Sequence, residues 1–187
     1  KIINNDILKI NFEKILKKDT VIFGNLPYNI STQILLKLIK INIWPPEYFK
    51  LILMFQKEVA ERILAKHNTT NYGRLSIVSN WRLKIIDHFD VSKNCFYPKP
   101  KVNSSVVIFE PKVNNSYKIK DILNLEKVTQ IFFSNRRKMI NKSFKKLFGN
   151  NQSINKIIKV DLTNRPSNLK PEDFYRMTEF YERGLNT

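Results

Sequence analysis

The stretch Val21-Ile22-Phe23-Gly24-Asn25-Leu26-Pro27-Tyr28 decides how the fold of this sequence is interpreted. Its first three residues are a β-branched and aromatic run, which predicts a buried strand that ends at the glycine. A second continuous apolar run, residues 51–55, predicts another buried parallel strand. Between the two runs, residues 34–39 place apolar side chains at helical spacing, and Ser31 or Thr32 can cap that helix. Strand, helix and strand in this order predict a βαβ unit.

The chain beyond this unit changes character near residue 112. Residues 57–66 and 74–80 are predicted helices, whereas residues 81–91 and 105–109 are predicted strands of an antiparallel pair at a sheet edge. Later in the chain the β-type runs disappear and helical periodicity takes over. We therefore expect an α/β domain over residues 1–112 and a small all-α domain over residues 113–187.

The turn Asn25-Leu26-Pro27-Tyr28 directly follows the first predicted strand, and ligands bind at the carboxyl ends of strands in open α/β sheets. An exocyclic adenine amine is a poor nucleophile because its lone pair is delocalised into the ring. The Asn25 side-chain oxygen and the Leu26 carbonyl can accept both amine hydrogens, while Pro27 fixes the backbone. Tyr28 offers a ring on which a flipped base can stack. The four residues alone also suit an ordinary strand-to-helix turn that packs Tyr28 in the core.

The charge of the chain favours a polyanionic partner. Thirty-three Lys and Arg against sixteen Asp and Glu give a formal net charge of +17. Neutralising phosphates releases their condensed counterions, although a Lys-rich composition explains part of the excess. No apolar run approaches the ~20 residues of a membrane span, so we expect no membrane association. With one cysteine, Cys95, and two histidines, we expect a metal-independent protein of a reducing compartment.

Four blocks of sequence, in this order and approximate spacing, resemble the KsgA family of rRNA adenine N6,N6-dimethyltransferases. The resemblance runs from about Asn5 to the C-terminus. It implies a Rossmann-like class I methyltransferase sheet followed by a small all-α domain. It also implies S-adenosylmethionine as cofactor and dimethylation of adenine N6 in small-subunit rRNA, coupled to ribosome assembly. The blocks are Gly24-Asn25-Leu26-Pro27-Tyr28-Asn29-Ile30-Ser31-Thr32, Gln56-Lys57-Glu58-Val59-Ala60, Tyr72-Gly73-Arg74-Leu75-Ser76 and Phe96-Tyr97-Pro98-Lys99-Pro100-Lys101-Val102-Asn103-Ser104.

The resemblance also assigns individual site residues. Asp6 matches the family's acidic residue at a strand end, which accepts from the adenine amine of the cofactor, and Ile7 lies beside it. Asn25 would lie near the cofactor as well as the target amine. Phe96 matches the aromatic residue that closes over the target base opposite Tyr28. Taken alone, an Asp at this position is more often a turn or helix cap, and Phe96 could simply fill the edge of the core.

Two parts of the family's cofactor site have no counterpart in this sequence. The resemblance places the Gly-rich turn and the acidic residue that holds the ribose before Lys1. We therefore expect residues 1–187 to supply the target-base pocket and one edge of the cofactor site. On this basis, the chain alone is expected neither to methylate RNA nor to bind S-adenosylmethionine measurably.

A basic face is predicted in the helical part. Residues 132–138 resemble a block typical of the KsgA branch. Helical geometry at ~100° per residue gathers lysines on one face, away from an apolar stripe that includes Phe132, Met139 and Phe144. Arg136 falls within the apolar arc, which predicts a paired and partly buried side chain. The face could follow an RNA backbone or could be an ordinary solvated surface. The candidate RNA-binding residues are Arg137, Lys138, Lys142 and Lys145.

Two alternatives share parts of this pattern. Erm-type large-subunit rRNA methyltransferases carry a similar Asn-Ile-Pro-Tyr turn, but Leu26 and the block at residues 72–76 favour the KsgA branch. A non-catalytic RNA-binding or assembly factor of the same fold, resembling the mitochondrial transcription factor B proteins, is the other alternative. The favoured interpretation implies a cytoplasmic monomer that acts on the immature small ribosomal subunit, or an organellar one in a eukaryote.

Overall fold

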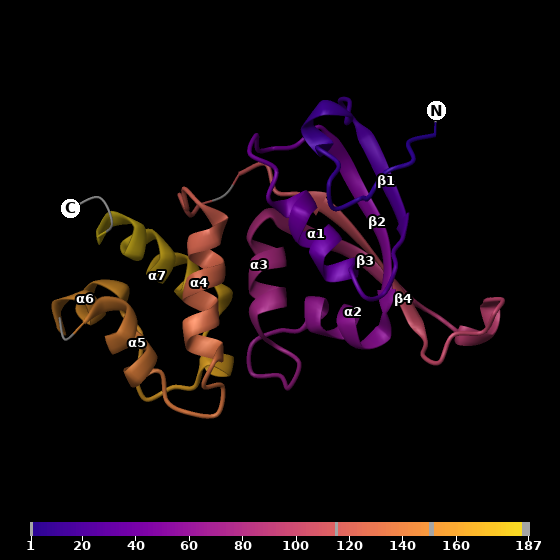
Figure 1. Cartoon of the computed structure of the whole chain (residues 1–187). Helices are drawn as coiled ribbons and strands as arrows, with labels where there is room; N and C mark the ends of the chain where they lie inside the picture. The colour runs from indigo at the N-terminus through magenta and orange to yellow at the C-terminus, as the bar shows by residue number, and fades with distance from the viewer. Residues whose placement is uncertain (1, 115, 150–151, 185–187) are drawn as a thin grey trace. The chain divides into compact units, whose positions relative to one another are not determined.

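The computed structural model describes residues 2–114, 116–149 and 152–184 (Figure 1). The chain forms two compact units. One consists of residues 1–64 and 82–114, and the other of residues 65–81 and 115–187. The stretch 65–81 therefore belongs to the second unit, although it precedes two strands of the first unit in the sequence.

Within the described residues, a sheet of four strands organises the first unit, in the order β1-β2-β4-β3. β1 (Thr20–Asn25) and β2 (Tyr48–Gln56) run parallel, which confirms the predicted βαβ unit. β4 (Ser104–Pro111) pairs antiparallel with β2 on one side and with β3 (Leu83–Val91) on the other. The predicted antiparallel pair at a sheet edge is therefore confirmed.

Helices α1 (Ser31–Ile39) and α2 (Lys57–Leu64) lie on the same face of this sheet (Figure 1). α1 connects the parallel strands, as its apolar spacing predicted, and buries Leu35 and Ile39 completely. α2 buries Ala60 and Ile63 and begins directly where β2 ends. A short 3-10 helix, η1 (Phe12–Lys14), precedes β1, and a second, η2 (Lys93–Cys95), follows β3.

Two details of the βαβ unit correct the sequence predictions. β1 is not a buried strand, because its residues alternate in exposure and the side chain of Phe23 is 73% exposed. Within the described residues β1 pairs with β2 alone, and the side chains of Val21, Phe23 and Asn25 on one of its faces are exposed. Ser31 does not cap α1 either: its hydroxyl donates to the Tyr28 carbonyl at 3.1 Å, and the N-cap position is Ile30.

The second unit is helical. Its core contains edge-to-face aromatic contacts, with ring centroids 5.8 Å apart for Phe132 and Phe174 and 6.1 Å apart for Tyr72 and Phe133. The Tyr175 hydroxyl donates to the Ile77 carbonyl at 2.8 Å and joins the two stretches of chain within this unit. Its elements are α3 (Arg74–Arg82), α4 (Ile122–Phe133), α5 (Asn141–Phe148), α6 (Gln152–Ile158), η3 (Pro166–Asn168) and α7 (Pro171–Gly184).

Two boundaries in this part differ from prediction. α3 continues through Arg82, so the first two residues of the predicted strand 81–91 are helical. The predicted apolar stripe is interrupted because α4 ends at Phe133 and α5 begins at Asn141. The Ser134 hydroxyl donates to the Ile131 carbonyl, and a turn follows in which the Lys138 amide donates to the Asn135 carbonyl. Such local bonds compete with helix continuation.

Candidate functional site

The turn after β1 is fixed by close packing beneath it. A Cβ on Gly24 would lie 2.7 Å from Leu26 Cδ2 and 2.9 Å from Leu53 Cδ2, so a side chain at this position would collide with both leucines. Leu26 is buried, and its Cδ2 atom lies close to Gly24 of the strand. Asn25 is the last residue of β1, and its side chain is exposed. The turn therefore presents a polar group at a strand end on a tightly packed base.

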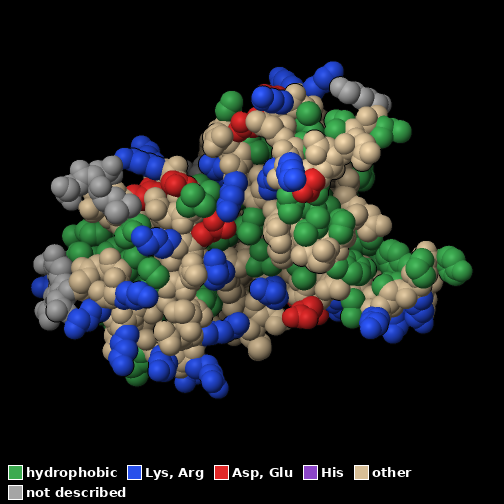
Figure 2. Space-filling model, viewed as in Figure 1, with side chains coloured by type: hydrophobic (Ala, Val, Ile, Leu, Met, Phe, Trp, Pro, Cys, Tyr) green, Lys and Arg blue, Asp and Glu red, His purple; other side chains and the backbone are tan. Residues whose placement is uncertain are grey.

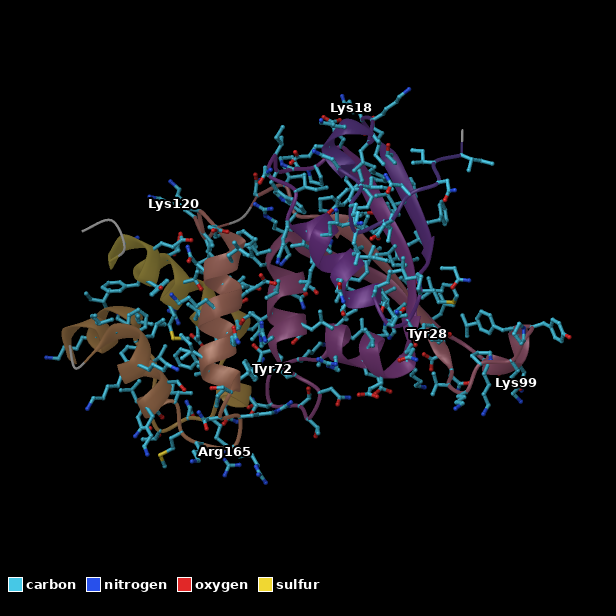
Figure 3. All side chains as sticks on the ribbon, in the orientation of Figure 1. Lys18, Tyr28, Tyr72, Lys99, Lys120 and Arg165 are labelled. Carbon is cyan, nitrogen blue, oxygen red and sulfur yellow. The ribbon has the colours of Figure 1, made fainter. Side chains whose placement is uncertain are left out.

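Tyr28 is held at both its backbone and its ring. Its hydroxyl lies 2.8 Å from Ser104 Oγ, and Ser104 is fully buried at the start of β4. Its carbonyl accepts the Ser31 hydroxyl, and the Ile30 amide donates to the Pro27 carbonyl at 3.1 Å. Tyr28 is half-buried rather than packed in the core. The hydroxyl of Tyr28, which Figure 3 labels, is therefore anchored while part of the residue remains exposed.

The loop at residues 92–103 ends directly at Ser104. The Asn103 side-chain oxygen accepts the Lys93 amide at 3.0 Å, and the Asn103 carbonyl accepts the Lys57 amide at 3.0 Å. Phe96 follows η2 in this loop and is half-buried. Because Ser104 also bonds with Tyr28, the loop that carries Phe96 and the turn that carries Tyr28 adjoin the same residue.

A charged cluster at the base of this loop was not anticipated from the sequence. Lys57 Nζ donates to Asp90 Oδ2 at 2.6 Å, and Ser105 Oγ donates to Asp90 Oδ1 at 2.6 Å. The hydrogen bond from Lys57 is the main cause that lowers the pKa of Asp90 below its ordinary value, and the same bond raises the pKa of Lys57. These residues come from three elements, so no local spacing signalled their contact.

Asp6 lies in a turn rather than at the end of a strand. Its carboxylate accepts the Leu8 amide at 2.9 Å, and its carbonyl accepts the Lys9 amide at 2.9 Å. Lys37 Nζ donates to the Leu8 carbonyl and ties the turn to α1. Asp6 is exposed and Ile7 half-buried. The turn-cap interpretation thus accounts for one oxygen of Asp6, and a cofactor role for Asp6 and Ile7 stays a prediction.

The four candidate RNA-binding residues are exposed but do not form one helical face. Arg137 and Lys138 lie in the connection between α4 and α5, so the predicted face that joined Lys138 with Lys142 and Lys145 is wrong. The last two share a face of α5, opposite its buried side chains. Arg136 is paired, as predicted, because its guanidinium donates to the Thr70 carbonyl, but its side chain is exposed.

The strand-turn-helix after β1, within a sheet of parallel strands followed by an antiparallel edge pair, defines a Rossmann-like class I methyltransferase fold. A crystal structure of a dimethyladenosine transferase from Plasmodium falciparum matches 96% of this chain and 72% of its own, with a TM-score of 0.73 and 28% identity. The 23S rRNA methyltransferase ErmE matches with a TM-score of 0.63 at 18% identity, which supports the fold alone.

The chain belongs to the ribosomal RNA adenine dimethylase family, whose model matches residues 1–183. A relative named ribosomal RNA small subunit methyltransferase A, from Pelagibacter ubique, is 48% identical over 97% of this chain and 69% of its own length. A Rhizobium etli protein of the same name is 41% identical over 92% of the chain and 62% of its own length. The chain thus spans roughly two thirds of these relatives. None of its described helices combines the length and apolarity that crossing a membrane requires.

Proposed function

We propose that this chain supplies the target-base pocket and the helical RNA-binding part of an adenine N6-dimethyltransferase that acts on small-subunit rRNA. The observation that carries the proposal is the turn at the carboxyl end of β1. There Asn25 is exposed, Leu26 is buried, and the hydroxyl of Tyr28 is fixed by Ser104. The names of the bacterial relatives support the same substrate.

The turn can activate an adenine amine without a general base. The Asn25 side-chain oxygen and the Leu26 carbonyl would accept the two N6 hydrogens, which favours a pyramidal amine with a localised lone pair. The Tyr28 ring would stack on the flipped base from one side, and Phe96 would close from the loop at residues 92–103. A base held in this way keeps its amine aimed in one direction, which lowers the entropic part of the barrier.

We propose S-adenosylmethionine as the cofactor, because its sulfonium would supply an electrophilic methyl group to the activated amine. The residues present fit one edge of such a site: Asn25 and Asp6 are exposed acceptors within the same compact unit. In our proposal Asp6 accepts from the cofactor's adenine amine, Ile7 lies beside it, and Asn25 contributes to both ligands.

The remaining parts of the proposal concern the partner. Residues 1–112 would carry the catalytic surface and residues 113–187 would grip RNA through Arg137, Lys138, Lys142 and Lys145. Their exposure supports contact with phosphates. We propose that the protein acts as a monomer on the immature small ribosomal subunit, in the cytoplasm or in an organelle of a eukaryote.

Methyl transfer to rRNA tests the proposal in the complete protein. With Asn25→Ala, turnover at saturating cofactor should fall at least about tenfold, because one oriented transition-state hydrogen bond is worth ~2.7–4 kcal/mol. RNA affinity should change little. The matched control is Asn29→Ala, an exposed asparagine four residues along the same connection. A fall in turnover of less than about tenfold relative to the control would refute the role, and a preference for large-subunit rRNA would favour an Erm-type enzyme.

A further inference from the structure

We propose that the tip of the loop at residues 92–103 is a second RNA-binding element, which holds an unpaired nucleotide next to the target adenine. The Tyr97 ring would stack on a base, and Lys99 and Lys101 would contact phosphates on either side of it. This inference rests on the proposed function, since it assigns part of the RNA substrate to a defined surface. We refer to Tyr97, Lys99 and Lys101 as the loop tip.

The exposure of the loop tip is the first observation. Tyr97 is 102% exposed, so its whole ring is available to a partner, whereas its neighbour Phe96 is half-buried. The two adjacent aromatic residues therefore have different surroundings. This difference allows Phe96 to contact the target base while Tyr97 contacts another nucleotide. An exposed aromatic ring keeps its apolar surface in contact with water, which is unfavourable until a partner covers it. Stacking on a nucleobase covers the ring, whichever base it is.

Charge is the second observation. Residues 92–103 contain three lysines, at positions 93, 99 and 101, and no acidic residue. Lys99 and Lys101 are exposed. In Figure 2 apolar and basic side chains mingle at this projecting end of the molecule, and Figure 3 places Lys99 there. A stacking ring among cations matches a phosphate backbone with accessible bases, which is the chemistry of single-stranded RNA.

The third observation is that the loop is anchored at its base. Asn103 accepts the amides of Lys93 and Lys57, and Asp90 binds Lys57 and the Ser105 hydroxyl beside it. At the tip, Pro98 and Pro100 each fix one backbone dihedral. A loop that is ordered before binding loses less conformational entropy when RNA arrives, so its few contacts yield more affinity.

Two RNA probes of equal phosphate number distinguish this surface from general electrostatic attraction. One is a hairpin with an unpaired adenosine-containing loop, and the other is a blunt duplex. In the complete protein, Tyr97→Ala should weaken hairpin binding by about fivefold or more, as expected for one lost stacked base, and duplex binding by less than about twofold. Tyr97→Phe should keep the hairpin affinity because it retains the ring. Fluorescence anisotropy measures the affinity of the unsubstituted protein and of both variants for each probe.

The lysines are tested by salt dependence with matched controls. Lys99→Gln and Lys101→Gln should each reduce the hairpin salt slope by about 0.7 per lost phosphate contact. Phe49→Ala serves as the aromatic control, since Phe49 is 53% exposed and has Lys50 Nζ 5.2 Å from its ring centroid. Phe49 is the second residue of β2, at the opposite end of the strand from Gln56. This substitution should leave the affinity for both probes unchanged.

Two results would overturn the inference: hairpin affinity of Tyr97→Ala within about twofold of the unsubstituted protein, or equal losses on hairpin and duplex. Methyl transfer by the unsubstituted protein is measured in parallel. If that protein binds the hairpin but transfers no methyl group to rRNA, the proposed function fails, whereas the role of the loop tip is still decided by Tyr97→Ala.

Discussion

The hydrogen bond between Tyr28 and Ser104 allows a sharp test of how the target-base turn is held. Tyr28→Phe leaves the Ser104 hydroxyl without its 2.8 Å partner on a fully buried residue, so the free energy of unfolding should fall by ~1–3 kcal/mol. Ser104→Ala leaves the Tyr28 hydroxyl on a half-buried side chain, where water can replace the partner. Its cost should be smaller, ~0.5–1.5 kcal/mol.

The double variant separates this bond from unrelated effects. Tyr28→Phe with Ser104→Ala removes both polar groups, so no buried hydroxyl is stranded and the cost should be less than the sum of the single costs. The coupling should be about 1 kcal/mol, measured by urea unfolding with unchanged m-values. Both single variants should also lower the turnover of methyl transfer more than they change cofactor KM, because the ring loses its fixed position.

Additivity would refute this reasoning. If the sum of the two single-variant costs equals the cost of the double variant to within about 0.3–0.5 kcal/mol, the two hydroxyls do not interact. Ser105→Ala is the control, because the Ser105 hydroxyl donates to Asp90 instead. Combined with Tyr28→Phe, it should give no coupling.

Three further outcomes are expected. Asp90→Asn should reduce the loss of stability at acid pH. Because the pKa of Asp90 in the folded protein lies below its ordinary value of 3.8, the ionised carboxylate stabilises the fold above that pH, and this stabilisation disappears as the pH falls through the lowered pKa. Thermal unfolding from about pH 5 to about pH 2 measures the difference between the variant and the unsubstituted protein. Lys142→Glu with Lys145→Glu should weaken RNA binding and reduce the salt slope by about one unit per lost phosphate contact, and an unchanged slope would leave these lysines as mere solvated surface. Gly24→Ala should cost ~1–3 kcal/mol by overpacking, and urea unfolding should show a smaller cost when the same substitution is made in a Leu26→Ala background, since Leu26 Cδ2 is the nearest atom to the new methyl group.

The βαβ unit could be predicted because its signals are local. The apolar runs and the helical spacing of residues 34–39 depend only on near neighbours in sequence, and β1, α1 and β2 form as expected. The burial of β1 could not be predicted in the same way. A run of three apolar residues suits an interior strand and an edge strand equally, and only the pairing partners decide between them.

The site could be predicted where its residues are contiguous. Residues 25–28 form the turn at the strand end, whereas the ion pair of Lys57 with Asp90 spans 33 residues and becomes visible only in the folded chain. The prediction of a basic helical face was wrong for a different reason. Helical periodicity assumes an unbroken helix, but the side chain of Ser134 competes for a helix carbonyl and the helix ends before Lys138.

The helical unit is assembled from two separate stretches of chain, and this limits how its gene can be divided. The ring of Tyr72 packs edge-on against Phe133, and Ile77 accepts the hydroxyl of Tyr175. A gene fragment that starts at codon 113 would encode neither Tyr72 nor Ile77, so its product would leave Phe133 without this ring contact and the Tyr175 hydroxyl without its acceptor. Chimeras that exchange the helical unit between relatives therefore need an additional pair of crossovers around residues 65–81. Functional recombinants should therefore inherit both stretches from the same parent. A mutation in one stretch should be compensated by a mutation in the other.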